Sequence, residues 1–165
     1  IRRPPKSTLF PYTTLFRSTQ SEIKSRKSRA FTPKVRPELL VNIHSIDSMR
    51  NNPVYRVIDA RTSDRYHGQN ETIDAVAGHI PGAMNAPYVD NLTEDKRMKP
   101  PDELHKIYMP ILGNIPPENI AFYCGSGVTS IHNALAVMHA GLGEPRIYPG
   151  SWSEWIVDPR RPIAT

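Results

Sequence analysis

A single cysteine occurs among the 165 residues, and the segment around it has the residue types of a reactive thiol site. The apolar residues 120–123 predict a short buried strand, and Cys124 follows it directly. Gly125, Ser126 and Gly127 come next, and their small side chains predict a tight loop. Apolar residues then recur at helical spacing, so Cys124 is expected just ahead of a helix N-terminus.

This placement predicts nucleophilic chemistry for the thiol. Glycines let successive backbone amides turn inward around a small concavity, and the helix dipole adds positive potential at the same point. Both effects favour the thiolate over the thiol near neutral pH. The alternative is that Cys124 is a small buried hydrophobic residue, which is the usual state of a lone cysteine. The strand, loop and helix together favour the nucleophile.

The loop that follows Cys124 carries no cation. Phosphatases with a reactive cysteine use the pattern C-x5-R, in which a loop arginine binds the phosphate dianion. The sixth residue after Cys124 is Ser130, and the loop CGSGVTS contains neither lysine nor arginine. A phosphatase is therefore not expected.

The loop instead resembles the active-site loop of the rhodanese-like sulfurtransferases, and CGSGVT is similar to the version found in 3-mercaptopyruvate sulfurtransferases. The motifs VIDART at 57–62, GHIPGAMNAPY at 78–88 and YPGSWSEWIVDPRRPIAT at 148–165 also resemble the C-terminal catalytic domain of the two-domain members. The resemblance covers residues 31–165. It implies an α/β fold of three layers, with a central parallel sheet covered by helices on both faces.

The resemblance also implies a set of site residues. Cys124 would carry a persulfide, and the substrate-binding residues would be Arg65, Gly125, Ser126, Gly127, Val128 and Thr129. From its spacing alone Arg65 is a solvated surface arginine, whereas the resemblance implies that it binds the anionic group of the donor. Ser126 would hydrogen-bond the persulfide or the leaving group. The cycle needs no metal or organic cofactor.

The identity of the sulfur donor stays open at this level. Members specific for thiosulfate typically have basic residues where this chain has Gly125 and Ser126, which favours 3-mercaptopyruvate. However, the mercaptopyruvate enzymes usually have a second arginine shortly before GHIPG, and residues 70–77 contain none; Thr72 is nearest. Thiosulfate is therefore the alternative donor, and a non-catalytic binding module is a more distant alternative. A thioredoxin-like protein or a small thiol, or cyanide in the test tube, would accept the sulfur.

The predicted elements bring the polar candidates to one edge of a sheet. A strand at 54–60 delivers Asp59, Arg61 and Arg65 to a loop, and ligands gather at the carboxyl ends of parallel strands. We assign Arg61 to a structural ion pair. His79 lies in the turn of GHIPG, where a histidine more often fixes the turn by hydrogen bonds than acts as an acid or base. The remaining histidines lack metal-ligand spacing, so no metal site is expected.

Helices are predicted between the strands. Ser45 is expected to cap a helix that runs to about residue 50, and an apolar stripe predicts a crossover helix at 101–113, with Pro110 limiting its last turn. A helix is also predicted after the cysteine loop, with Thr129 or Ser130 as its N-terminal cap and Gly141 or Gly143 at its C-terminal end. The prediction is based on the helical spacing of Ile131, Leu135, Met138 and Leu142. A short strand at 83–85, another at 146–148 and a final segment with Trp152 and Trp155 in the core complete the domain.

The N-terminal part has a different character. Residues 1–37 hold ten lysines and arginines against Glu22, a net charge of +9, whereas residues 38–165 hold eleven against fifteen acids, a net charge of −4. Residues 8–18 resemble a translated sequencing adaptor, so residues 1–18 are expected to be non-native and are excluded from the fold; a natural basic leader is the alternative. Residues 19–37 are predicted to be a basic flexible linker, and residues 38–165 the catalytic domain. The resemblance implies that an N-terminal rhodanese domain is missing before the linker.

Composition excludes several classes of function. The basic charge belongs to the N-terminal part, so a nucleic-acid-binding face is not expected on the domain. No apolar run is long enough to span a membrane, and residues at the N-terminus lack the apolar stretch and the small-residue cleavage site of a signal peptide, so we expect no membrane partner. One cysteine leaves no internal disulfide, which fits a reducing compartment and a cytoplasmic location.

Overall fold

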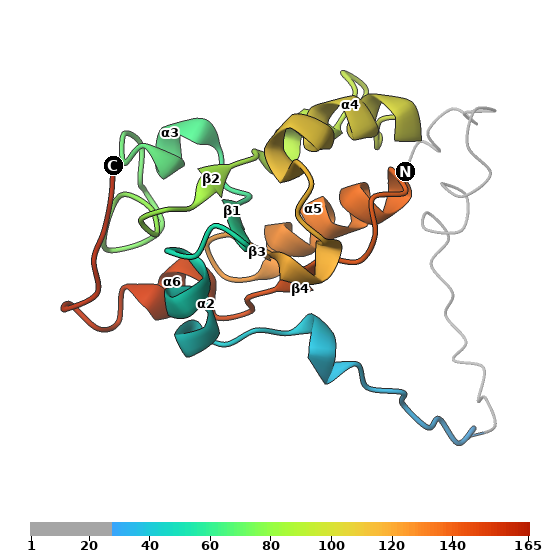
Figure 1. Ribbon diagram of the computed structural model, residues 1–165, viewed down its shortest axis with the longest axis horizontal. Helices are drawn as coiled ribbons and strands as arrows, with labels where there is room; N and C mark the ends of the chain where they lie inside the picture. Colours follow the sequence, from blue (N-terminus) through green and yellow to red (C-terminus); the bar gives the residue numbers. More distant parts are fainter. Residues whose placement is uncertain (1–27) are drawn as a thin grey trace, which may run out of the picture. The chain divides into compact units, whose positions relative to one another are not determined.

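A four-stranded parallel sheet with the order β2-β1-β3-β4 lies at the centre of the computed structural model, which describes residues 28–165 (Figure 1). The strands are β1 (Arg56–Asp59), β2 (Met84–Asn85), β3 (Ile120–Tyr123) and β4 (Arg146–Ile147). β1 and β3 pair along their full length, so that Asp59 lies opposite Tyr123. This register brings the residues that follow both strands to the same edge of the sheet.

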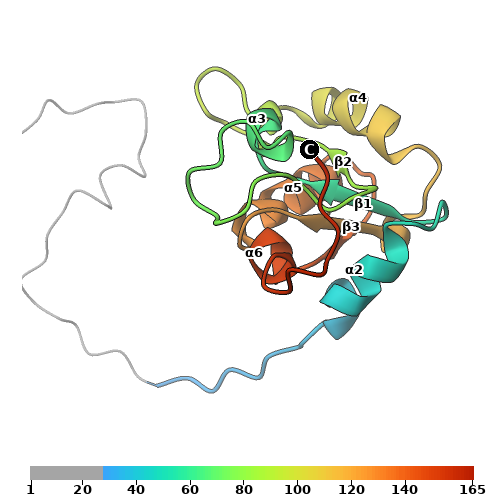
Figure 2. The ribbon, with the colours of Figure 1, turned by 90° about the vertical axis from the view of Figure 1, so that its left-hand side faces the viewer.

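Helices cover both faces of the sheet, as the fold prediction requires (Figure 2). Val57 and Tyr123 face a cluster with Ile46 and Met49 of α2 (Ile43–Met49) and with the two tryptophans of α6 (Ser151–Trp155). Ile58 and Phe122 face a second cluster, formed with α4 (Pro101–Leu112) and α5 (Val128–His139). Adjacent strand residues thus enter opposite cores, which is the side-chain alternation of a buried parallel strand. The three-layer α/β prediction is confirmed.

Short elements complete the domain. The 3-10 helices are η1 (Pro37–Leu39), η2 (Tyr88–Asn91) and η3 (Pro117–Asn119), and a single helical turn, α3 (Ser63–Tyr66), follows β1. The chain divides into two compact units, residues 1–34 and residues 35–165, and all these elements belong to the second unit. Residues 28–34 of the first unit are in no helix or strand. The predicted leader at 1–18 and the first part of the linker, residues 19–27, lie outside the described residues.

Two predicted helix caps are wrong. Asn42, not Ser45, caps α2: its side-chain oxygen accepts the Ser45 amide at 2.9 Å, because the helix begins three residues earlier than predicted. α5 has Gly127 at its N-cap and no side-chain cap. The hydroxyl of Ser130 donates back to the Gly127 carbonyl oxygen at 2.9 Å, so it is not available to cap the helix. Pro110 lies inside α4, which continues to Leu112.

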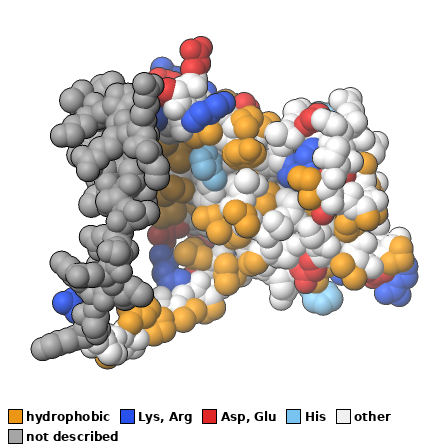
Figure 3. All heavy atoms as spheres, turned by 180° about the vertical axis from the view of Figure 1, so that it is seen from behind, with side chains coloured by type: hydrophobic (Ala, Val, Ile, Leu, Met, Phe, Trp, Pro, Cys, Tyr) orange, Lys and Arg blue, Asp and Glu red, His pale blue; other side chains and the backbone are white. Residues whose placement is uncertain are grey.

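Three of the four apolar residues that predict α5 face outward, whereas Leu142 lies beyond the helix and packs against the core. Ile131, Leu135 and Met138 are 59%, 54% and 45% exposed, and the buried face of the helix consists of small and polar residues together with Val137. Seen from behind, apolar side chains gather on the surface of the molecule (Figure 3). The helical spacing therefore identifies the helix but does not identify the face that enters the core. Within residues 28–165 no helix has the length and apolar character needed to cross a membrane.

Candidate active site

Cys124 lies at the carboxyl end of β3, where the chain turns into α5 (Figure 1). The Ala60 amide donates to the carbonyl oxygen of Tyr123 at 2.8 Å, which joins the ends of the two central strands beside the cysteine. Gly127 closes the loop with a φ of 84°, and a Cβ atom there would lie 2.4 Å from the carbonyl oxygen of Pro149. Only glycine fits both the conformation and the space, so this position fixes the path of the loop.

The sulfur of Cys124 is surrounded by hydrogen-bond donors. Burial alone raises the pKa of the thiol, because a charge is poorly solvated there. The hydroxyl of Thr129 and the backbone amides of Ser130, Ser126 and Gly127 hydrogen-bond the sulfur and more than offset burial, so the pKa is lowered from its ordinary value. Thr129, predicted as a possible helix cap, thus points its hydroxyl to the sulfur. The arrangement stabilises a thiolate with neutral dipoles.

The first turn of α6 holds the other side of the loop. The Cys124 amide donates to the hydroxyl of Ser151 at 3.1 Å, and the Trp152 amide donates to the carbonyl oxygen of Cys124 at 3.0 Å. The Ser153 amide donates to the carbonyl oxygen of Gly125 at 2.9 Å. These bonds occupy the outward backbone groups of the loop. The amides of Ser126, Gly127 and Ser130 hydrogen-bond the sulfur instead.

A pocket of about 180 Å³ reaches the cysteine, although Cys124 itself is only 1% exposed. Five of the predicted substrate-binding residues line it together with Cys124: Arg65, Gly125, Ser126, Val128 and Thr129. Gly127 contributes its amide to the sulfur rather than a pocket wall. Three lining residues were not predicted: Ile73, Asp74 and Ser153. They come from segments about 50 residues before and 30 residues after the cysteine, and no local sequence signal marks them.

Arg65 lies in this pocket in contact with two carboxylates. Its Nε and Nη2 groups donate to Glu71 at 3.0 and 2.9 Å, and Nη2 also donates to Asp74 at 2.8 Å. Asp74 in turn accepts from the hydroxyl of Ser153 at 3.0 Å. A Cβ atom added at Gly125 would lie 3.6 Å from Asp74 Oδ2 and 3.8 Å from Arg65 Nη1. The ion pairs therefore lie against the loop that carries the cysteine.

Arg61 and His79 have the structural roles that the sequence predicts. Arg61 is 2% exposed and donates to Asp59 at 2.7 Å and to the carbonyl oxygen of Gly78 at 2.6 Å. The Nδ1 atom of His79 lies 2.8 Å from the carbonyl oxygen of Tyr66, and its ring stacks on that of Tyr66. Burial lowers the pKa of His79, so the ring is neutral near pH 7. Both residues connect the turn at 78–79 to the strand and helix before it.

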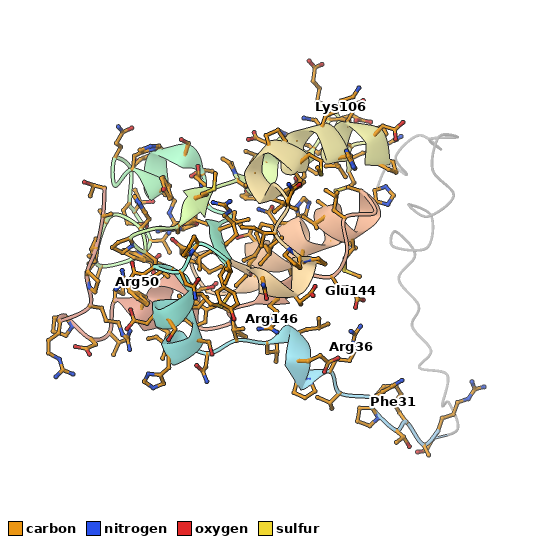
Figure 4. All side chains as sticks on the ribbon, in the orientation of Figure 1. Phe31, Arg36, Arg50, Lys106, Glu144 and Arg146 are labelled. Atoms are coloured by element: carbon orange, nitrogen blue, oxygen red, sulfur yellow. The ribbon has the colours of Figure 1, made fainter. Side chains whose placement is uncertain are left out.

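A second, larger pocket of about 380 Å³ has different chemistry. Arg36 and Glu144 point toward each other beside it (Figure 4), and Arg36 also pairs with Glu38. Its other lining residues are Leu39, Pro117, Glu118 and Arg146, and it holds no nucleophile. Among residues 28–165, no group of three or more histidine, cysteine, aspartate or glutamate side chains is placed to hold a metal ion. The thiol chemistry therefore belongs to the pocket at Cys124.

Comparison with known proteins gives consistent results. Residues 42–158 match the family described as the rhodanese-like domain. The chain is 47% identical over 127 residues to a probable 3-mercaptopyruvate sulfurtransferase of Pseudomonas aeruginosa, which covers 77% of this chain and 45% of that protein. It is 39% identical over 104 residues to a thiosulfate sulfurtransferase of Rattus norvegicus, covering 61% of this chain and 35% of that protein. The chain thus spans less than half the length of these curated relatives.

Solved structures show the same fold. The structure of an anaerobic ergothioneine biosynthesis enzyme from Chlorobium limicola, in complex with its natural substrate trimethyl histidine, aligns with a TM-score of 0.70 and 27% identity. The alignment covers 79% of this chain and 32% of that enzyme. The likeness is to one part of a longer protein, as it is for the curated relatives.

Proposed function

The chain belongs to the rhodanese-like domain family, and we propose that it is a sulfurtransferase that carries sulfur as a persulfide on Cys124. The donor is a compound of the 3-mercaptopyruvate type, and the acceptor is a thiol, or cyanide in the test tube. One observation carries the proposal: the thiol with a lowered pKa faces Thr129 and three backbone amides beside an accessible pocket. This environment suits a site that holds a negative sulfur in both resting states, first the cysteine thiolate and then the terminal sulfur of the persulfide.

The first half of the cycle loads sulfur onto the enzyme. The Cys124 thiolate attacks the sulfur of 3-mercaptopyruvate, a new S–S bond forms, and the C–S bond breaks. Its electron pair leaves on pyruvate as the enolate, which takes up through solvent the proton that the donor thiol loses, so the persulfide is left as its anion. Negative charge moves from the cysteine sulfur to the terminal sulfur and the enolate. Amides fixed by the loop stabilise that charge without reorganising, in the same way as an oxyanion hole.

The second half of the cycle unloads the sulfur. An acceptor thiolate attacks the terminal sulfur, a new S–S bond forms on the acceptor, and the electron pair of the broken bond returns to Cys124 as thiolate. Ser126 is exposed at the pocket and is placed to hydrogen-bond the persulfide or the departing group. No metal or organic cofactor takes part in either half. The result is a ping-pong cycle on one sulfur atom.

Arg65 is the proposed contact for the anionic group of the donor. Its guanidinium lies in the same pocket as Cys124, so a small donor can touch both. Val128 and Ile73 supply exposed apolar surface to the pocket and suit the carbon skeleton of such a donor. Positions 125 and 126 hold glycine and serine rather than basic residues, which supports 3-mercaptopyruvate over thiosulfate as the donor. The similarity to relatives of both names keeps thiosulfate as the second candidate donor.

Mass spectrometry tests the proposal directly. The 165-residue chain is incubated with 3-mercaptopyruvate or thiosulfate, and we expect one added sulfur atom on Cys124 with at least one donor. A Cys124→Ser variant treated in the same way should gain none. Specificity constants for the two donors then rank them, with 3-mercaptopyruvate expected first. No added sulfur with either donor would overturn the proposed activity and leave the binding-module alternative.

We also propose that a second rhodanese-like domain accompanies this one and covers the exposed apolar stripe of α5. The stripe begins at Val128, which lines the pocket, and continues through Ile131, Leu135 and Met138. The matched relatives have more than half of their length outside the aligned part, enough for such a domain. Genomic DNA upstream of the codon for Thr19 tests this. A second rhodanese-like domain encoded in frame supports it, and stop codons in that frame would contradict it.

The single cysteine supports a reducing compartment, and the proposed location is the cytoplasm. The proposed partners are the small-molecule donor and a thiol acceptor, either a small thiol or a thioredoxin-like protein.

A further inference from the structure

The positive charge of Arg65, the proposed anion-binding residue of the pocket, is already offset by two carboxylates of the protein. Arg65 carries one positive charge, and Glu71 and Asp74 bring two formal negative charges within 3.0 Å of it. The cluster of these three residues therefore has a formal charge of −1. Without these partners the guanidinium would attract anions through its full positive charge. The two carboxylates therefore weaken the electrostatic attraction between Arg65 and any anionic donor.

The two carboxylates of the cluster are held in different ways. Glu71 has only 3% of its side chain exposed and accepts the amides of Ile73 and Asp74 at 2.9 and 3.0 Å, as well as contacting the buried Arg61 at 3.4 Å. Asp74 is 9% exposed and lines the pocket, and its second contact is the exposed hydroxyl of Ser153. Glu71 is thus a structural anchor. Asp74 is the carboxylate that a donor meets.

Arg65 keeps hydrogen-bonding capacity for a donor. Its Nε and Nη2 groups are occupied, whereas its Nη1 group donates to no partner among residues 28–165. A Cβ atom added at Gly125 would meet both Nη1 and the carboxylate of Asp74 within 4 Å, which places them side by side next to the cysteine loop. An anion bound at Nη1 must therefore lie close to Asp74.

We propose that Asp74 determines the class of donor: its carboxylate beside Arg65 selects singly charged sulfur donors over dianionic ones. This rests on the proposed sulfurtransferase function. The unfavourable Coulomb energy of a donor near a cluster of net charge −1 scales with the donor's own charge, so it is twice as large for a dianion. 3-Mercaptopyruvate carries one charge through its carboxylate, whereas thiosulfate carries two. Arg65 then orients a monoanion by directional hydrogen bonds rather than by net attraction.

The variant Asp74→Asn tests this by removing one charge and keeping the shape. We expect the KM for thiosulfate to fall about tenfold and that for 3-mercaptopyruvate about threefold, because the charge product differs by a factor of two. The kcat for each donor should change by less than about twofold, since Asp74 does not hydrogen-bond the cysteine sulfur. Asp74→Glu, which keeps the charge, should restore the discrimination between the donors.

A second measurement needs no turnover. Sulfate and pyruvate should each slow the alkylation of Cys124 by iodoacetamide, and Asp74→Asn should strengthen protection by sulfate more than protection by pyruvate. Asp90→Asn, the same change at an exposed aspartate of η2, should alter neither. If Asp74→Asn changes protection by both anions equally, or weakens it, Asp74 only supports Arg65 and the proposal is wrong. Failure of the proposed function is a separate outcome, seen as wild-type protein that forms no persulfide.

Discussion

On one side of the pocket the sulfur of Cys124 faces peptide amides and the hydroxyl of Thr129, whereas on the other side Arg65 faces two carboxylates. The first side stabilises negative charge with neutral dipoles that the loop fixes in place. The second side contains full charges, one positive and two negative, with a formal sum of −1. The difference separates two tasks: the neutral side sets the reactivity of the sulfur, and the charged side sets which donor approaches it.

The charged side of the pocket depends on the buried Arg61, and replacing Arg61 should have the largest effect on the stability of the domain. Arg61→Met leaves Asp59, which is fully buried, without its cation and removes one contact of Glu71. We expect a loss of about 3–5 kcal/mol in the free energy of unfolding, as for a buried ion pair broken on one side. Urea unfolding measures it.

Arg160→Met is the matched control for that variant. Arg160 pairs with Asp158 in an exposed position, so its loss should hardly change the unfolding midpoint. Equal stability of the two variants would show that Arg61 does not support the charged side.

The neutral side can be weakened without touching any charge. Thr129→Val removes one hydrogen bond to the thiolate, a charge-assisted bond of about 1.5–3 kcal/mol, so kcat/KM should fall roughly ten- to a hundredfold. The ratio between the two donors should stay the same. Thr129→Ser keeps the hydroxyl and should recover most of the activity. A changed donor ratio in Thr129→Val would mean that the two sides of the pocket do not act separately.

The charged side should affect donor binding more than chemistry. Arg65→Ala is expected to raise the KM for both donors about tenfold, the usual size for one charged hydrogen bond, with a smaller change in kcat. Steady-state kinetics with each donor measures this. Arg146→Ala, at an arginine in the other pocket, should leave the KM values unchanged. Unaltered KM values in Arg65→Ala would remove Arg65 from the list of donor contacts.

The sequence predicted the features that depend on neighbouring residues. The placement of Cys124 between a strand and a helix follows from a short apolar run and three small residues. An ion pair was predicted for Arg61, and its partner Asp59 lies only two residues away; the turn at His79 is marked by glycine and proline. These features were therefore accessible from local pattern.

Features that depend on distant contacts were not accessible. Ser153 contacts Asp74 across 79 positions, and Ser151 contacts Cys124 across 27. Both serines lie in the motif at 148–165, but nothing in that motif indicates these contacts. The outward face of α5 was missed for a related reason. An apolar stripe predicts a helix, but it does not show whether the surface that covers it belongs to the same domain.

The pH dependence of Cys124 alkylation tests the central claim most directly. The rate of reaction of the 165-residue chain with iodoacetamide follows the thiolate fraction. Because the donors around the sulfur lower the pKa of the folded thiol, the rate should reach half of its maximum at a lower pH than it does in the urea-unfolded chain. A midpoint equal to or above that of the unfolded chain would show that burial outweighs the amides, and the proposed persulfide chemistry would lose its basis.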